Sequence, residues 1–187
     1  HLWSMPDKKK LRHRIPPLCG GAWAVCFSPD GHSFATCGRD RTIRIWNTSS
    51  GKLLREVVGQ EAEQEGMAFS SDLKLLATID REPNSLRIWE VDSGKLFVRF
   101  DDCGDAITFS PDGTLIAVGS GFADKRSNDV RIWNLKQQRV LQRIEGLSQA
   151  AHVVRFGNDG RRLAIGTAFP GIAELWDLES NQRLLSL

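Results

Sequence analysis

Short runs of apolar residues, separated by residues that favour turns, predict that the chain is built from β-strands. The run AWAVCFS ends at residues 28–31, where Pro at the second position and Gly at the fourth suit a type I turn. SFATCG follows, and after a turn at residues 38–41 the segment TIRIWN alternates Ile43 and Ile45 with Thr, Arg and Trp, as a half-buried strand does. Residues 49–51 then turn into KLLREVV. This unit therefore predicts four short antiparallel strands and no long helix.

The same unit recurs through the chain with a period of about 43 residues. Tryptophans separated by 43, 43, 44 and 43 residues mark the repeat: Trp3, Trp46, Trp89, Trp133 and Trp176. A second marker, FSPDG or a variant of it, precedes the last four, beginning at Phe27, Phe69, Phe109 and Phe156. Helical repeats of similar period show apolar residues at i, i+3 and i+4, which this chain lacks. A period of about 40 to 45 residues with a Trp-Asp signature is instead typical of four-stranded propeller blades.

We therefore predict an all-β protein, a β-propeller of four-stranded antiparallel blades with about four and a half blades present. The expected units are a half-blade at 1–17, blade one at 18–58, blade two at 59–100, blade three at 101–145 and blade four at 146–187. Trp3 aligns with the third strand of a blade, and residues 9–15 align with the fourth. Because this alignment makes the chain begin halfway through a blade, whereas closed propellers consist of about four to eight whole blades, we expect the chain to be part of a longer propeller.

The repeat resembles that of the WD-repeat (tryptophan-aspartate repeat) β-propeller family over essentially the whole chain. FSPDG, a short apolar strand and then RIWN or LWD, repeated in register, carry the resemblance. It implies a scaffold that binds protein partners. It also implies a His bonded through a strand Ser or Thr and a turn Asp to the Trp, but the Gly-His pair is missing from every repeat. The turn Asp remains only as Asp40, with Thr36 and Thr78 as partial members, so we expect stability to depend on apolar packing.

Composition and charge indicate one soluble domain with an ordinary core. The chain has 187 residues, 41% of them hydrophobic, and a formal net charge of +2. No apolar run approaches the roughly 18 to 20 residues of a membrane span, so we expect no membrane segment. The four cysteines form no CxxC pair, and Cys26 and Cys37 lie in apolar runs. We read these two as small buried hydrophobes and expect a cytoplasmic protein with no metal site and no cofactor.

Other patterns that suggest chemistry have simpler structural explanations. The basic run at residues 8–14 fits the solvated face of an outer strand, and no aromatic residues interleave with it for base stacking, so we expect no nucleic-acid binding. His32 is expected to be exposed in a turn and His152 to be partly buried in a strand, and the histidines do not converge. No GxSxG elbow is present. We therefore expect a protein that is not an enzyme.

Acidic residues gather in the loops that join fourth to first strands and second to third strands. Successive strands reverse direction, so these loops emerge on one face, which we call the loop face. Its candidate partner-binding residues are Arg39, Glu61, Glu63, Glu65, Asp80, Glu82, Asp101, Asp102 and Asp105. Arg39 is included because the residue before the turn Asp is commonly exposed in the resembling family. The pattern favours docking of a basic peptide or protein, and the alternative is a set of merely solvated loops.

These observations predict a non-catalytic protein-interaction scaffold whose loop face docks a partner. The alternative is part of a propeller enzyme, or a regulatory domain fused to a catalytic domain outside this sequence. A chain of four and a half blades leaves one face of blade four and the half-blade without neighbours. We therefore expect self-association of the isolated chain and loss of order first at residues 1–17.

Overall fold

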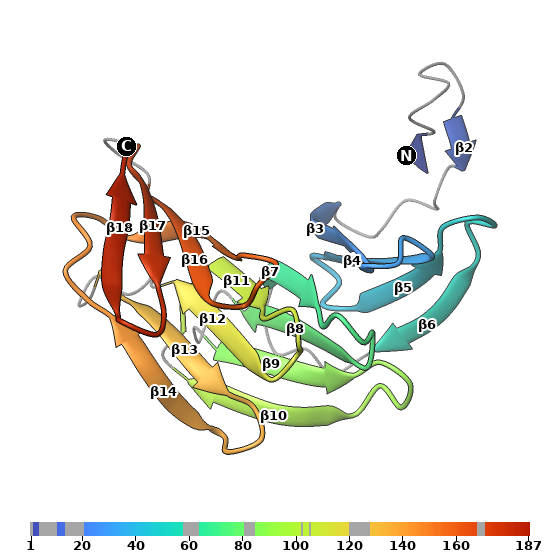
Figure 1. Cartoon of the computed structure of the whole chain (residues 1–187). Coiled ribbons are helices and arrows are strands. Elements are labelled where there is room, and N and C mark those ends of the chain that lie inside the picture. The colour runs from blue at the N-terminus through green and yellow to red at the C-terminus, as the bar shows by residue number, and fades with distance from the viewer. Residues whose placement is uncertain are drawn as a thin grey trace.

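The computed structural model places the strands of each predicted unit in one sheet. It describes residues 2–3, 11–13, 21–57, 64–80, 85–101, 103–104, 106–119, 128–167 and 171–187. These residues form four sheets of four antiparallel strands and one two-stranded sheet. The four sheets follow one another around an arc that does not close into a ring (Figure 1). The predicted all-β propeller class is confirmed.

Each four-stranded sheet runs in sequence order from its first strand to its fourth. Blade one contains β3 (Ala22–Phe27), β4 (Ser33–Gly38), β5 (Ile43–Asn47) and β6 (Leu53–Val57). Blade two contains β7 (Gln64–Phe69), β8 (Leu75–Asp80), β9 (Ser85–Glu90) and β10 (Leu96–Asp101). Blade three contains β11 (Ala106–Phe109), β12 (Leu115–Gly119), β13 (Val130–Asn134) and β14 (Arg139–Ile144). Blade four contains β15 (Ala151–Phe156), β16 (Arg162–Thr167), β17 (Ala173–Asp177) and β18 (Gln182–Ser186).

Two further strands lie near the N-terminus. They are β1 (Leu2–Trp3) and β2 (Leu11–His13), which pair antiparallel with Leu2 opposite His13. This is the pairing expected of the third and fourth strands of a blade. The other residues of the segment 1–17, on which we predict loss of order, lie outside the described residues.

The core lies between blades. The first strands β3, β7, β11 and β15 contact one another in succession. Between blades one and two, Ile43, Ile45 and Val57 pack with Leu76 and Trp89. Between blades two and three, the ring of Trp133 lies 4.2 Å from that of Phe100, centroid to centroid, and Trp176 packs against the cluster that joins blades three and four. Each of these three tryptophans thus packs against the preceding blade, as stacking of blade on blade requires.

A serine and an aspartate organise the turn between the first and second strands of blades one to three. The serine Oγ donates to the aspartate Oδ1 at 2.5–2.7 Å, in the pairs Ser28–Asp30, Ser70–Asp72 and Ser110–Asp112. The same serine oxygen accepts a hydrogen bond from the backbone N–H of the first residue of the second strand, and this bond closes the hairpin. Gly31 and Gly113 adopt positive φ at the fourth turn position, a conformation that favours glycine.

The two cysteines predicted to be small buried hydrophobes both face blade two. Cys37 is buried and Cys26 is half-buried, packed against the cluster that joins blades one and two. Burial raises the pKa of Cys26 to about 12 and that of Cys37 to about 11. Both thiols are therefore protonated at neutral pH and behave as apolar groups.

Candidate functional site

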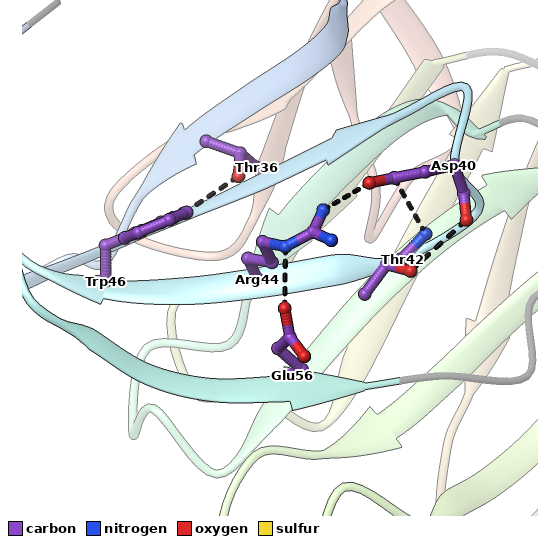
Figure 2. Close-up of polar contacts among 6 residues, drawn as sticks. All are labelled: Thr36, Asp40, Thr42, Arg44, Trp46 and Glu56. Carbon is purple, nitrogen blue, oxygen red and sulfur yellow. Dashed lines mark hydrogen bonds and ion pairs between the residues drawn. The ribbon is translucent and has the colours of Figure 1, made fainter. Parts of the chain in front are cut away.

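The turn between β4 and β5 holds one aspartate firmly, and the arginine before this aspartate is exposed. Thr42 N–H donates to Asp40 Oδ1 at 3.3 Å, and the Arg44 guanidinium lies 2.6 Å from Asp40 Oδ2. Arg44 Nε also donates to Glu56 Oε1 at 2.8 Å, so that one arginine links three segments of the blade (Figure 2). Arg39 is exposed, whereas Asp40 is half-buried.

The arginine at the centre of this cluster is firmly charged. Burial alone would lower the pKa of Arg44, but hydrogen bonds to Asp40 and Glu56 outweigh it, and the pKa of the guanidinium is raised. Because Arg44 binds both carboxylates, neither of them is fully available to a ligand. Arg39 and Arg41 are the exposed charged residues of this turn.

Ion pairs at the same place in blades two and three use aspartates that sequence reasoning did not assign to this role. Arg87 pairs with Asp80 at 3.1 Å, and Arg131 pairs with Asp129 at 3.2 Å. In each blade the arginine stands two residues before the repeat tryptophan. In blade four the charges are reversed: Glu174 occupies the arginine position and pairs with Arg183 at 3.0 Å. The recurring Arg-Ile-Trp triplet identifies the arginine of each pair in the sequence. The aspartate could not be identified in the same way, because its distance in sequence from the arginine varies from blade to blade.

The repeat tryptophans retain a hydrogen bond in some blades and lose it in others. Trp46 Nε1 donates to Thr36 Oγ1 at 2.8 Å, and Trp89 Nε1 donates to Thr78 Oγ1 at 3.1 Å. These bonds confirm the two threonines as partial members of the expected network. The buried Trp133 Nε1 has no hydrogen-bond partner within the described part of the chain. The side chain of Trp3 lies outside the described residues.

One of the predicted partner-binding residues is not available on the loop face. Asp80 was expected in a loop, but it is the last residue of β8, is 0% exposed, and accepts a hydrogen bond from Ser85 at 2.9 Å. A β-bulge between Gln64 and Gly66 places Gln64 opposite Asp80 and so prolongs the ladder. The prediction for Asp80 as a docking residue is therefore wrong, because its carboxylate is buried with Arg87.

The other members of the predicted set divide into two groups. Arg39 is exposed in the β4–β5 turn, and Asp101 is exposed at the end of β10, where Arg99 Nε donates to it at 2.9 Å. The β4–β5 turn follows a second strand, and Asp101 ends a fourth strand. Second and fourth strands run in the same direction, and all four sheets share one strand order and contact through their first strands. Both positions therefore lie on the same edge of the stack. The backbone of Glu65 lies within β7, and its side chain is not described. The remaining residues, Glu61, Glu63, Glu82, Asp102 and Asp105, lie outside the described residues.

The histidines occupy the environments expected of them. His32 is exposed in the first turn of blade one, and His152 is half-buried in β15. Across the described ranges, no group of three or more His, Cys, Asp or Glu side chains is arranged to hold a metal ion. The same ranges contain no helix of the length and hydropathy that a membrane span needs.

A stack of four-stranded antiparallel sheets with a tryptophan in each third strand defines the β-propeller class. The model of the family described as WD domain, G-beta repeat matches residues 13–47 and 105–134. These matches cover the first three strands of blades one and three. These two segments are therefore similar to WD repeats, and the resemblance inferred from the motifs is confirmed.

Three curated proteins illustrate what the chain is similar to. Autophagy-related protein 16 of Arabidopsis thaliana is 23% identical over 81% of the chain and 37% of its own length. WD repeat-containing protein 26 homolog of Drosophila melanogaster is 36% identical over 52% of the chain and 17% of its own length. Small ribosomal subunit protein RACK1 of Drosophila melanogaster is 26% identical over 65% of the chain and 38% of its own length. The matched part of the chain thus spans less than two fifths of each relative.

Proposed function

We propose that the chain is a non-catalytic protein-interaction scaffold whose partner docks on the loop face. The observation that carries this proposal is the contrast between charges that are buried or half-buried in ion pairs and charges that are exposed on the same edge of the stack. Arg44 and Arg87 hold Asp40 and Asp80 in place, while Arg39 and Asp101 remain exposed. Exposed groups on a rigid β framework suit recognition, because little conformational freedom is lost when a partner binds.

The comparisons support the scaffold role. One of the three relatives is named as a WD repeat-containing protein, and another is named as a protein of the small ribosomal subunit. A location in the cytoplasm stays a prediction that rests on the lack of paired cysteine motifs in the sequence.

The partner that the loop face suits is a basic peptide or protein segment. In addition to the exposed Asp101, the sequence next to the strands of blades two and three contains five acidic residues of the predicted set: Glu61, Glu63, Glu82, Asp102 and Asp105. Charges at the rim of an interface act mainly on the association rate and its salt dependence. Arg39 would contact an acidic or carbonyl group of the same partner.

Replacing Glu61, Glu63, Asp101 and Asp102 together by Ser or Asn tests this proposal. Partners recovered with the wild-type chain should associate with the variant about tenfold more slowly at low salt, and the difference should shrink as salt is raised. The midpoint of thermal unfolding should change little. Arg39→Ala should also weaken association, whereas the control Arg161→Ala should not, because Arg161 is exposed in a turn on the opposite edge. Undiminished association of the quadruple variant would rule out the loop face as the docking site.

We also propose that the chain associates with itself through the faces of blades one and four that no other sheet of the described residues covers. Val25 and Phe27 are 63% and 54% exposed on β3, on the side away from blade two. At the other end of the stack, Val153 and Leu185 are exposed on the side away from blade three. Apolar surface of this kind is usually covered by a partner, and a second copy of the chain supplies matching sheet faces.

A further inference from the structure

A hollow of about 340 Å³ opens on the edge of blade two opposite the loop face. It lies between the turn that joins β7 to β8 and the turn that joins β9 to β10. Its lining residues are Asp72, Lys74, Leu75, Glu90, Asp92, Ser93 and Phe97. This volume is at the lower end of the range of small ligand sites, about 300–1,000 Å³. It is enough for one large side chain of a partner.

The apolar part of the hollow is supplied by Phe97 and Leu75. Phe97 is 42% exposed on the outer strand β10, and Leu75 is half-buried. Because transfer of a phenyl ring out of water is favourable in free energy, a ligand that covers Phe97 would be stabilised. The walls are held by one backbone hydrogen bond between the two turns and one within the β9–β10 hairpin. Val91 N–H donates to Lys74 O at 2.8 Å, and Glu90 N–H donates to Lys95 O at 2.9 Å. The hollow is therefore formed before any ligand binds.

The rim of the hollow is acidic. Asp72, Glu90 and Asp92 contribute three carboxylates, and Lys74 contributes one ammonium group that lies 3.8 Å from Asp72 in an exposed pair. Hydrogen bonds from Ser70 and from the backbone of Lys74 lower the pKa of Asp72, so this carboxylate is charged at neutral pH. A hollow with an apolar floor and a negatively charged rim is complementary to a peptide in which an apolar side chain stands next to a positively charged side chain.

The other blades lack this combination at the same repeat positions. Where blade two has Phe97, they have Leu54, Leu141 and Leu184. Where blade two has Glu90 and Asp92, blade one has Asn47 and Ser49, and blade three has Asn134 and Lys136. Blade four keeps two acids there, but Arg161 and Arg162 replace Lys74 and Leu75. The aromatic floor with an acidic rim is thus particular to blade two.

We infer that this hollow binds a linear peptide segment of a partner, with one large apolar side chain seated on Phe97 and a neighbouring Lys or Arg at the acidic rim. The site lies on the opposite edge from the loop face and is a second, separate docking point. It therefore does not depend on where the partner of the loop face binds.

Selection from a displayed library of random dodecapeptides tests the inference with the whole chain as bait. Enriched peptides should share a large apolar residue next to Lys or Arg. Their dissociation constants, measured with synthetic fluorescent copies, should rise about tenfold or more for Phe97→Ser. Ala at the apolar position of the peptide should have an effect of similar size. A library that enriches nothing, or that enriches acidic peptides, would overturn the inference.

Matched variants separate this site from the loop face and from folding defects. Leu141→Ser removes the residue at the same repeat position in blade three and should leave peptide binding unchanged. Glu90→Lys with Asp92→Lys changes only exposed groups and should abolish binding of the basic peptides while the chain stays folded by circular dichroism. The loop-face variant should bind the peptides normally, so failure of one site does not imply failure of the other. If Phe97→Ser instead weakens self-association and leaves peptide affinity unchanged, the occupant is a second copy and the inference is wrong.

Discussion

At the scale of single residues, the side chain opposite the third-strand arginine decides whether the repeat tryptophan of blades one to three has a hydrogen-bond acceptor; in blade four, Trp176 Nε1 donates instead to Glu174 of its own strand. Thr36 and Thr78 hold this position in blades one and two, and each accepts the indole N–H of its blade's tryptophan. Val118 holds it in blade three, and there the buried Trp133 Nε1 has no acceptor within the described ranges. Threonine and valine have nearly the same shape, so the difference between them is one hydroxyl group.

We expect Thr78→Val to lower the free energy of unfolding by about 1–3 kcal/mol, because it leaves the buried Trp89 indole N–H without its acceptor. Urea denaturation followed by tryptophan fluorescence measures the change. Val118→Thr is the reciprocal control: it offers an acceptor to Trp133 and should cost less stability than Thr78→Val. Equal stability of Thr78→Val and the wild type would show that the hydrogen bond contributes nothing net.

The aspartates of the first turns make stability depend on acid pH. Hydrogen bonds from the neighbouring serines lower the pKa of Asp30, Asp72 and Asp112 below the ordinary value of 3.8. Because the pKa is lower in the folded state than in the unfolded state, these groups stabilise the fold above that ordinary value, and the stabilisation is lost as the pH falls through the folded pKa.

We therefore expect the free energy of unfolding to decrease as the pH is lowered from about 5 to about 2. The triple variant with Asn at Asp30, Asp72 and Asp112 should be less stable at neutral pH and show a shallower decrease, since its amides do not titrate. Thermal melts across the pH series measure both slopes. Parallel slopes would mean that other carboxylates control acid unfolding.

At the scale of elements, a buried ion pair joins β8 to β9. Asp80 and Arg87 have side chains that are 0% and 3% exposed, and Ser85 donates a further hydrogen bond to the same carboxylate. The pair lies at the edge of the stack where the connection between these strands begins. Removal of one member of a buried pair is costly, because the remaining charge is left in a region of low polarity.

We expect Asp80→Asn to lower the free energy of unfolding by about 3–5 kcal/mol, since it removes the charge that balances Arg87. Asp101→Asn is the matched control: its partner Arg99 is also on blade two, but the Asp101 side chain is 71% exposed, and the expected loss is less than about 1 kcal/mol. Both are measured by urea denaturation. Similar losses for the two variants would show that the buried pair contributes no more to the free energy of unfolding than the exposed pair does.

At the scale of the whole molecule, the proposed self-association depends on the two sheet faces that no other described sheet covers. Val25 and Phe27 form an apolar strip on β3, where the ring of Phe27 lies 5.8 Å from that of Phe34, centroid to centroid. This strip continues the stacked aromatic pair of Phe34 and Trp46 out to solvent. A second sheet placed on it would bury the strip as the blades bury one another inside the stack.

We expect the chain to self-associate with rising concentration, and Val25→Ser with Phe27→Ser to reduce the apparent mass, because these changes remove the apolar strip. Light scattering across a concentration series measures it. Leu54→Ser with Leu141→Ser is the control, since both leucines are about half exposed but lie on outer strands. A monomer at every concentration with a single cooperative melt would contradict the prediction.

The sequence by itself determined the strands, their order and the stacking of the blades. Alternation with a period of two, turns of Ser, Pro, Asp and Gly, and tryptophans about 43 residues apart are local signals, and each blade repeats them. The Trp46–Thr36 and Trp89–Thr78 contacts could also be predicted from the sequence, because the partners lie on adjacent strands at nearly constant spacing.

The tertiary structure alone decided which charged residues are exposed and where a hollow forms. The sequence predicts Asp80 to be a loop residue. In the structure, the bulge in β7 extends the strand pairing to Asp80, and its carboxylate forms a buried ion pair with Arg87. The hollow on Phe97 arises because two turns about twenty residues apart meet at one edge of blade two. Burial and concavity depend on neighbours brought from other strands, and these neighbours are set by register and packing rather than by the local pattern.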